Sequence, residues 1–269
     1  MKTRWLRPPE KLPDLQARLA APRFLDGSVL SVTFETDPAL IAALLPHPLE
    51  HDGSGIATVF VGRWQRSNCV GPFSGGALNL RASYGTLSGV YCLTMPMSTD
   101  AAVIFGRELY GEPKKLARVT LERTGARVSA TIERHGITYI AIAAELSERD
   151  ENPGEARGLT FHLKATPRAD GHGFDAAPLL VGVTSRTRLR LVERGTAQLT
   201  FADSPFDPVA DFPVRRVVSA TYSEGDTETT AQILAALDPT AALPYYLGKL
   251  DPLDGWDAVA TAATMEKPR

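Results

Sequence analysis

The sequence predicts a single, mainly β domain of the α+β class, in which an antiparallel sheet is accompanied by a few helices. Short apolar runs alternate with turn residues along most of the chain, which is typical of a protein with many strands. Turns such as that at residues 124–126 join consecutive runs, as expected of hairpins. No repeat, low-complexity segment or change of composition divides the 269 residues into two domains.

The expected elements follow from these signals in chain order. Residues 1–22, rich in proline and charge, are expected to form an N-terminal arm or short surface helix before one domain over residues 23–269. A helix is predicted over 37–45, because Asp37 is a good cap and Pro38 a good first helical residue. The apolar runs predict strands over 29–34, 55–62, 77–84, 89–95, 117–124, 126–133, 137–144, 160–167, 178–193 and 196–201.

The remaining predictions concern connections and the C-terminal part. A loop is expected over 147–158, a hairpin connection over 193–196, and a loop running into a strand over 209–222. The apolar spacing of residues 227–237 predicts an amphipathic helix, ended by the Asp-Pro pair that follows it. Residues 244–246, Pro-Tyr-Tyr, fall in a short tail.

Composition is that of an ordinary globular protein and disfavours several classes. A net charge of −2 gives no reason to expect nucleic acid or an anionic membrane as partner. The N-terminus has no apolar signal core, and no apolar run approaches the ~18 residues that span a bilayer. Cys69 and Cys92 suggest neither a metal site nor a disulfide framework, which favours a reduced cytoplasmic protein. The five histidines show no metal-site spacing, so neither a metal nor an organic cofactor is expected.

Lys114 and Lys115 form the most informative pair in the chain, because apolar residues flank it. A lysine is a nucleophile only as the neutral amine, and its free side chain has a pKa of ~10.4. Apolar surroundings and a second nearby cation both lower that pKa. Lowering it by about three units destabilises the charged form by about 4 kcal/mol, which deep burial can supply. Taken alone, such a pair is more often exposed on a surface.

The wider string at residues 106–117, G-R-E-x-x-G-x-P-K-K-L-A, closely resembles the signature of the acetoacetate decarboxylase family. The resemblance implies a curled, barrel-like β fold around a closed pocket, and a homo-oligomer, a tetramer or larger. It also implies that Lys114 forms a Schiff base with a keto substrate, without another cofactor, and that Lys115 lowers its pKa as a cationic neighbour. Further segments resemble the family in the same order: residues 34–38, 45–50, 71–73, 91–93, 163–164, 167, 170–171 and 211–215.

The chain departs from the family pattern at the positions of three charged groups. The resemblance implies an arginine at or near Gly27 and glutamates near Phe60 and at Gly75. No Asp or Glu lies between Asp52 and Asp100, where three arginines fall. Either these strands bury apolar faces with arginines at the rim, or the pocket presents guanidinium groups to an anionic substrate. The substrate-binding candidates are Arg63, Arg66, Arg81, Tyr245, Phe60, Gly75 and Gly27.

Proton transfer near an imine requires an acid–base group. Tyr110, four residues before Lys114, is the first candidate, and Tyr246 or Tyr245 is the second, although any of them could simply pack as an aromatic ring. In an extended chain Glu112 would share a face with Lys114, where its carboxylate would raise the lysine pKa. Glu112 is therefore expected to turn outward or to pair with Lys115.

The leading functional hypothesis is a Schiff-base lyase acting on a small keto acid and an aldehyde. Some relatives of the decarboxylases resemble this chain in lacking the acidic residues, and they catalyse aldol condensation and dehydration. Lys114 would thus condense pyruvate, or a similar 2-keto acid, with an aldehyde as an aldolase-dehydratase. A decarboxylase of acetoacetate or another β-keto acid is the first alternative, and a non-catalytic barrel that binds a small ligand is the second.

Overall fold

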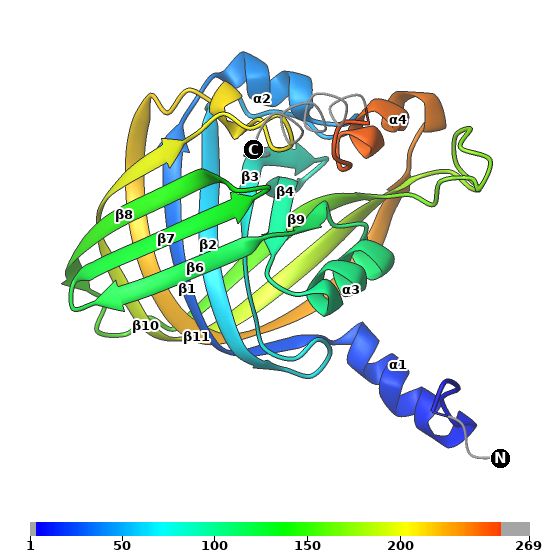
Figure 1. The fold of residues 1–269 in the computed structure, drawn as a ribbon, viewed down its shortest axis with the longest axis horizontal. Coiled ribbons are helices and arrows are strands. Elements are labelled where there is room, and N and C mark those ends of the chain that lie inside the picture. Colours follow the sequence, from blue (N-terminus) through cyan, green and yellow to red (C-terminus); the bar gives the residue numbers. More distant parts are fainter. Residues whose placement is uncertain (1–3, 254–269) are drawn as a thin grey trace, which may run out of the picture.

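Strands dominate the chain, as the alternation of apolar runs predicts. The computed structural model describes residues 4–253, whose strands form an 11-stranded sheet that curls on itself (Figure 1). Ring closure comes from β11, which pairs with both β1 and β10, while β8, β7 and β6 branch from β10. Most pairings are antiparallel, but β4 pairs in parallel with β5 and β9. The predicted mainly β, barrel-like fold is confirmed.

The strands are β1 (Arg23–Glu35), β2 (Ile56–Ser67), β3 (Phe73–Tyr84), β4 (Leu87–Met97), β5 (Lys114–Leu116), β6 (Arg118–Thr124), β7 (Arg127–Arg134), β8 (Ile137–Arg149), β9 (Glu155–Lys164), β10 (Leu179–Phe201) and β11 (Arg216–Ala236). The helices are η1 (Pro9–Lys11), α1 (Leu12–Ala20), α2 (Pro38–Leu44), α3 (Asp100–Tyr110), η2 (Val209–Asp211) and α4 (Pro239–Leu247). None of the helices within residues 4–253 is long and apolar enough to cross a membrane.

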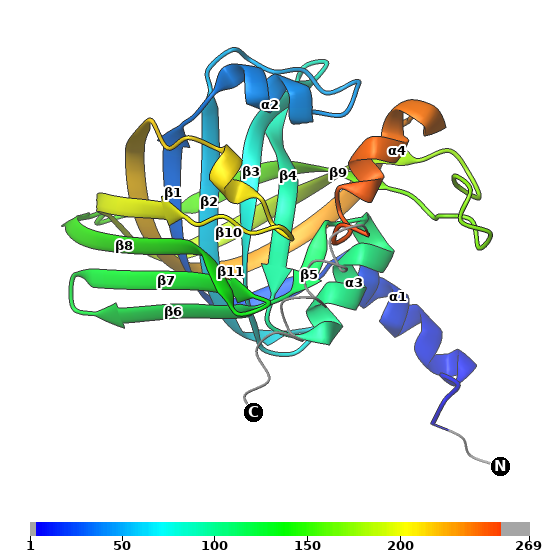
Figure 2. The same ribbon diagram turned by 45° about the horizontal axis from the view of Figure 1, so that its top comes forward.

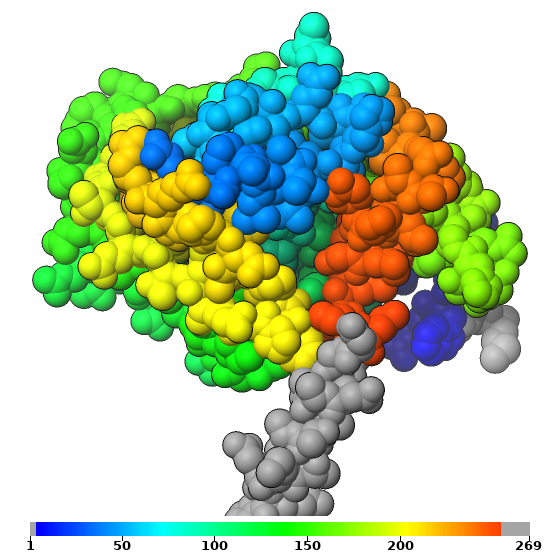
Figure 3. Space-filling model, turned by 90° about the horizontal axis from the view of Figure 1, so that it is seen from above, coloured from blue at the N-terminus to red at the C-terminus, as the bar shows by residue number. Residues whose placement is uncertain are grey.

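The helices sit around the ends of the curled sheet. Helix α1 extends away from the barrel, while α3 lies beside β5 and β9 (Figure 2). From above, α2, the segment around η2, and α4 together cover one end of the barrel (Figure 3). The predicted helix at 37–45 is confirmed as α2, and the Asp37 side chain accepts a hydrogen bond from the Ala39 backbone at 2.9 Å.

Alternation along the strands divides the interior into two compartments. In β1, Leu30, Val32 and Phe34 are fully buried in the main hydrophobic core. Their neighbours Val29 and Ser31 point to the other face of the sheet and line a separate cavity. Burial of each large apolar side chain contributes about 1.5–3 kcal/mol to stability, so the core holds the ring in shape independently of the cavity.

The structure corrects the local predictions for β10 and β11. Residues 227–237 do not form a helix, because they continue β11 and pair with β10 in a ladder that includes Thr227 and Thr187. The hairpin predicted at 193–196 is also absent from the described chain. Here β10 runs on from its pairing with β9 to its pairing with β8, with a register shift at Gly195. A Cβ at Gly195 would lie only 1.9 Å from the Glu145 carbonyl oxygen, so this strand crossing requires glycine.

Two helices were not predicted. Residues 100–110 read as an apolar run but form α3, and the expected tail around residues 244–246 lies in α4. Both begin with a capping side chain: Thr99 accepts from the Ala102 backbone at 3.3 Å, and Asp238 accepts from the Ala241 backbone at 2.8 Å.

Candidate active site

The junction between α3 and β5 places Lys114 in the molecule. Helix α3 ends at Gly111, which adopts the left-handed conformation with φ 71°. The chain then turns back along its own helix, and β5 pairs with β4 so that Lys114 lies opposite Met95. The Arg107 guanidinium fixes this return by donating a hydrogen bond to the Lys114 carbonyl oxygen at 3.0 Å.

Gly106 makes the close approach of helix and strand possible. A Cβ at this position would lie 1.9 Å from Glu112 Oε2 and 2.5 Å from Lys114 Nζ. Real Cβ contacts are not that short, so a larger residue would displace both side chains. The glycine of the family-like string therefore has a steric role, which is to make room for the charged groups of the site.

Lys114 faces a cavity of about 370 Å³ enclosed by the ring of strands. Its side chain is only 8% exposed. The apolar part of the wall contains Phe24, Val29, Phe60, Trp64, Phe73, Met95, Met97, Ala156, Val183 and Leu189, and the polar part contains Ser31, Asn79, Thr160, His162, Ser185, Thr187, Ser223, Thr227 and Thr229. A cavity that combines apolar side chains with polar groups is typical of a small-molecule site.

Glu112 lies in the same cavity and forms an ion pair with Lys114. The distance from Lys114 Nζ to Glu112 Oε2 is 2.7 Å, and the carboxylate is buried. Burial opposes its charge, but the neighbouring Lys114 ammonium holds the pKa of Glu112 below its ordinary value. The prediction that Glu112 turns outward or pairs with Lys115 is wrong, because the turn at Gly111 directs the carboxylate inward.

His162, on β9, was not predicted as a site residue. It is 1% exposed, lines the cavity, and places Nε2 3.9 Å from Glu112 Oε1. Burial lowers the pKa of His162 to about 4, so the imidazole is neutral at pH 7. Its Nδ1 is buried and has no hydrogen-bond partner in the described part of the protein. No local spacing in the sequence links it to Lys114, because the sheet alone brings them together.

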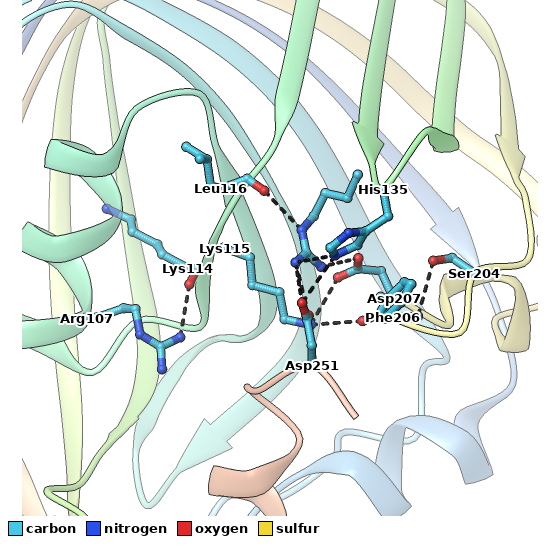
Figure 4. A network of polar contacts seen from close by, with 10 residues as sticks. Arg107, Lys114, Lys115, Leu116, His135, Ser204, Phe206, Asp207 and Asp251 are labelled. Carbon is cyan, nitrogen blue, oxygen red and sulfur yellow. Dashed lines mark hydrogen bonds and ion pairs between the residues drawn. The ribbon is translucent and has the colours of Figure 1, made fainter. Parts of the chain in front are cut away.

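Lys115 points away from the cavity, since successive residues of a strand face opposite sides. Its ammonium donates to the Phe206 carbonyl oxygen at 2.9 Å and pairs with Asp207 at 3.2 Å and Asp251 at 3.0 Å (Figure 4). Arg134 pairs with both carboxylates as well. The position of Lys115 therefore contradicts its expected role as the free cation beside the Lys114 amine.

A different lysine, Lys249, contacts the turn that carries Glu112. Lys249, which follows α4, is 6% exposed and donates hydrogen bonds to the carbonyl oxygens of Gly111 and Leu163. Burial and the Arg107 charge lower the pKa of Lys249 to about 7. It ties the C-terminal helix to the turn that carries Glu112. No pattern in the sequence signals this role, because the contact depends on how α4 packs.

The three arginines proposed to bind an anionic substrate do not line the cavity. Arg63 lies on the exposed face of β2. Arg66 pairs with Asp26 at 2.7 Å, and Arg81 pairs with Asp52 at 2.8 Å, with both guanidinium groups at least half exposed. Among the residues described, the expectation of a guanidinium in the pocket wall is wrong. The alternative placement, with arginines outside and apolar faces inside, is the observed one.

The three positions where the family pattern implies charged groups are apolar, and two of them line the cavity. Phe60 and Gly27 line the cavity. The space that a Cβ would take at Gly27 is occupied by Trp64, 2.7 Å away, and the space at Gly75 is occupied by Met97, 2.5 Å away. These predicted positions are therefore brought together at the site, with an aromatic ring and a thioether where side chains of their own would extend.

None of the three candidate tyrosines lines the cavity. Tyr110 packs against Val181 and Val183. Burial raises the pKa of its hydroxyl to about 12, although a hydrogen bond with Thr229 acts in the opposite direction. The Tyr245 hydroxyl donates to the Ala43 carbonyl oxygen at 3.5 Å, and Tyr246 contacts the Phe174 ring at 5.3 Å between centroids. Their positions support packing roles, and Glu112 replaces them as the nearest proton-transfer group.

The arrangement can support imine chemistry. A carbonyl compound in the cavity would meet the Lys114 nitrogen, with the Glu112 carboxylate within reach of the same nitrogen and the neutral His162 beyond it. An ion pair favours the charged forms of both partners, so attack by the amine requires Glu112 to hold the proton during the reaction. Within residues 4–253 there is no cluster of three His, Cys, Asp or Glu residues that could hold a metal ion.

Several known proteins resemble this chain over most of its length. Acetoacetate decarboxylases of Burkholderia vietnamiensis and Burkholderia ambifaria are 29% and 27% identical over 210 and 208 residues, each match covering 76% of this chain and 84% of the relative. Solved structures share the fold at lower identity. An acetoacetate decarboxylase of Legionella pneumophila has a TM-score of 0.72 at 18% identity, covering 80% of this chain and 87% of its own.

Two further solved structures also share this fold. The enduracididine biosynthesis enzyme MppR, complexed with the condensation product of pyruvate and imidazole 4-carboxaldehyde, has a TM-score of 0.69 at 17% identity, with coverage of 80% and 89%. An acetoacetate decarboxylase-like enzyme of Sphingomonas wittichii has a TM-score of 0.69 at 19% identity, with coverage of 88% and 99%. The family model for acetoacetate decarboxylase matches residues 7–236. The chain therefore belongs to the acetoacetate decarboxylase family.

Proposed function

We propose that the protein is a Schiff-base lyase in which Lys114 activates a carbonyl donor as an enamine and joins it to an aldehyde with loss of water. One observation carries this proposal: Lys114 is buried in the cavity, and the carboxylate of Glu112 lies 2.7 Å from its nitrogen. A paired carboxylate can take the proton that a nucleophilic lysine must lose, and can return it to the departing oxygen.

The proposed steps balance in atoms and protons. The Lys114 nitrogen adds to the donor carbonyl, and the oxygen leaves as water after receiving a proton, which gives an iminium ion. Loss of a proton from the adjacent carbon forms an enamine, which attacks the aldehyde carbon. The new hydroxyl leaves as a second water, and one water hydrolyses the imine. The net reaction joins donor and aldehyde into an unsaturated carbonyl compound and releases one water.

Pyruvate is the donor that the sequence suggested, and a fold relative was solved with pyruvate. Among residues 4–253, however, no arginine lines the cavity to pair with a donor carboxylate. The reaction class therefore rests on Lys114 and Glu112, and pyruvate is one donor among those to be tried.

Decarboxylation of a β-keto acid is the second candidate, favoured by one specific observation. A negative group beside a substrate carboxylate promotes its departure as CO2, and Glu112 places a carboxylate next to the reacting nitrogen. The matched Burkholderia relatives are acetoacetate decarboxylases. Release of CO2 from acetoacetate well above the uncatalysed rate, lost in Lys114→Met, would favour this candidate over the aldol reaction.

Borohydride trapping tests the shared part of both candidates. The protein is incubated with pyruvate, acetoacetate and uncharged ketones, reduced, digested and examined by mass spectrometry. We expect the added mass of the donor on Lys114, and no adduct in Lys114→Met. Lys115→Met is the matched control, because its side chain points outside the cavity, and it should still be labelled at residue 114.

Two results would contradict the proposal. The absence of any adduct on Lys114 with every donor would exclude Schiff-base chemistry at this residue. Unchanged ligand affinity and turnover in Lys114→Met would instead support the non-catalytic binding barrel.

A further inference from the structure

The cavity around Lys114 lacks a partner for a substrate carboxylate. Of the described residues that line it, Lys114 is the only lysine or arginine, and Glu112 already neutralises its charge. His162 adds no positive charge at neutral pH, because burial lowers its pKa to about 4. A substrate carboxylate here would be buried beside another carboxylate without a cation of its own, which is strongly unfavourable.

The polar groups that await a ligand are uncharged. Asn79 and Thr229 line the cavity at 9% exposure each, and His162 at 1%. The Asn79 Oδ1 and His162 Nδ1 atoms are buried without hydrogen-bond partners in the described structure, whereas the Thr229 hydroxyl lies against that of Tyr110. Buried polar atoms generally have partners, so two such unpartnered atoms on the wall of one cavity indicate a ligand that supplies them. An amide, a hydroxyl and a neutral imidazole match hydroxyl or carbonyl groups.

Another part of the wall is aromatic. Trp64 stacks on Phe73 with 4.9 Å between ring centroids, and Phe24 meets Phe73 edge-on at 5.7 Å. Trp64 and Met97 fill the spaces left by Gly27 and Gly75. This wall favours an apolar chain or ring on the ligand. A cavity of about 370 Å³ also holds a larger molecule than a three-carbon acid.

We propose, on the basis of the Schiff-base function above, that the donor is an uncharged carbonyl compound rather than a keto acid. It carries an apolar body against Trp64 and Phe73, and a hydroxyl or second carbonyl group near its reacting carbonyl, within reach of Asn79 or Thr229. The Lys114 nitrogen forms the new bond to the carbonyl carbon, and the carbonyl oxygen leaves as water. A β-hydroxy ketone or a β-diketone has this combination of groups.

The test compares donors of equal length that differ in charge. Borohydride trapping on Lys114 is timed with 2-heptanone, 4-hydroxy-2-heptanone and 2-oxoheptanoate, each first calibrated with a free amine. After this correction, we expect the two neutral ketones to label Lys114 at least tenfold faster than the keto acid, and the hydroxy ketone to be the fastest. Faster labelling by 2-oxoheptanoate would overturn the substrate class while leaving the Schiff-base function standing.

A binding measurement separates failure of the substrate class from failure of the chemistry. In Lys114→Met no imine can form, but the Trp64 ring still reports occupancy of the cavity through its fluorescence, with Lys114→Met/Trp64→Phe as the blank for the other tryptophans. Tighter binding of the neutral ketones than of 2-oxoheptanoate supports the proposal even if no adduct forms in the wild type. Equal or tighter binding of the keto acid contradicts it.

A charge introduced into the wall gives a second, independent readout. Thr187 lines the cavity, whereas Thr184 on the same strand is exposed outside it. Thr187→Arg should shift the labelling preference toward 2-oxoheptanoate by at least tenfold, about 1.4 kcal/mol. Thr184→Arg, with the same added charge, should leave the preference within twofold. An unchanged preference in Thr187→Arg, with circular dichroism showing the native fold, would contradict the view that the missing cation sets the substrate class.

Discussion

Lys114 and Lys115 are adjacent in sequence but lie in opposite environments. Lys114 faces a cavity with one carboxylate, Glu112, whereas Lys115 faces Asp207 and Asp251, which Arg134 also contacts. On the first side the ion pair lines the larger cavity of about 370 Å³, whereas on the second side several opposite charges are matched within the protein. The same side chain can therefore serve chemistry on one face of a strand and stability on the other.

The largest expected effect comes from removing the charge of the one carboxylate on the cavity side. Glu112→Gln keeps the shape of the side chain but cannot exchange a proton with Lys114. We expect the rate of imine formation to fall by about 10²–10⁴-fold, the range for general acid–base catalysis. Single-turnover borohydride trapping measures it. Ligand binding in the same variant should change much less, and an unchanged trapping rate would show that Glu112 does not transfer the proton.

The next effect concerns the pH dependence of stability on the cavity side. The folded pKa of His162 is about 4, whereas an unfolded histidine titrates near ~6.5. Between these values the unfolded chain binds a proton that the folded chain does not, so stability is full above the unfolded pKa and is lost as pH falls toward 4. The loss from this residue is about 3 kcal/mol.

His162→Gln tests this assignment, because glutamine does not titrate. Denaturant unfolding from pH 7 to pH 4 should show a shallower fall in the free energy of unfolding for the variant than for the wild type. His172→Gln is the control, since this residue is exposed. Parallel curves for wild type and His162→Gln would show that the buried imidazole does not contribute to the acid sensitivity.

A smaller loss of stability is expected on the other side of the strand. Lys115→Met removes one cation from the network with Asp207 and Asp251, but Arg134 still pairs with both carboxylates. We expect the free energy of unfolding to fall by about 2 kcal/mol, less than for a buried charge left wholly unpaired. Labelling of Lys114 should remain within a fewfold of wild type. A loss of labelling without a loss of stability would reverse the roles assigned to the two lysines.

The smallest effect is predicted for the three external arginines. Arg63→Gln, Arg66→Gln and Arg81→Gln should each leave the trapping rate within twofold and stability within about 0.5–1 kcal/mol, as for exposed groups. Trapping with pyruvate and with 2-heptanone measures both substrate classes. A selective loss of pyruvate labelling in any of the three would restore the anion-binding role that the sequence suggested.

The sequence is sufficient for the fold class, because this depends on local patterns, and the family-like string pointed to a lysine that lies in the cavity. Alternating apolar runs predicted the strands, and the capping residues Asp37 and Pro38 predicted α2. The orientation of Glu112 could not be predicted in the same way, since it depends on the left-handed turn at Gly111, whereas an extended chain was assumed. The error at residues 227–237 has a related cause, because pairing with β10 overrides local helical periodicity.

The parts of the site that escaped prediction come from distant strands and helices. His162 lies close to Glu112 because β9, which carries it, pairs with β4. Lys249 contacts Gly111 because α4 packs beside that turn. No spacing in the sequence encodes either approach. For the arginines, the sequence left open a guanidinium group in the pocket wall. Strand alternation places them outside the cavity, and ion pairs hold Arg66 and Arg81 there.

A single methyl group at Gly106 would be enough to disturb the proposed site. Glycine inside a helix is less stable than alanine by about 1 kcal/mol, so α3 on its own would gain from a methyl group here. That methyl group would occupy the place of the Glu112 carboxylate and the Lys114 ammonium. A mutation that favours the helix would thus silence the site while every residue of the reaction is still present. A relative can keep both lysines and the whole barrel, and yet be inert because it carries one more carbon atom.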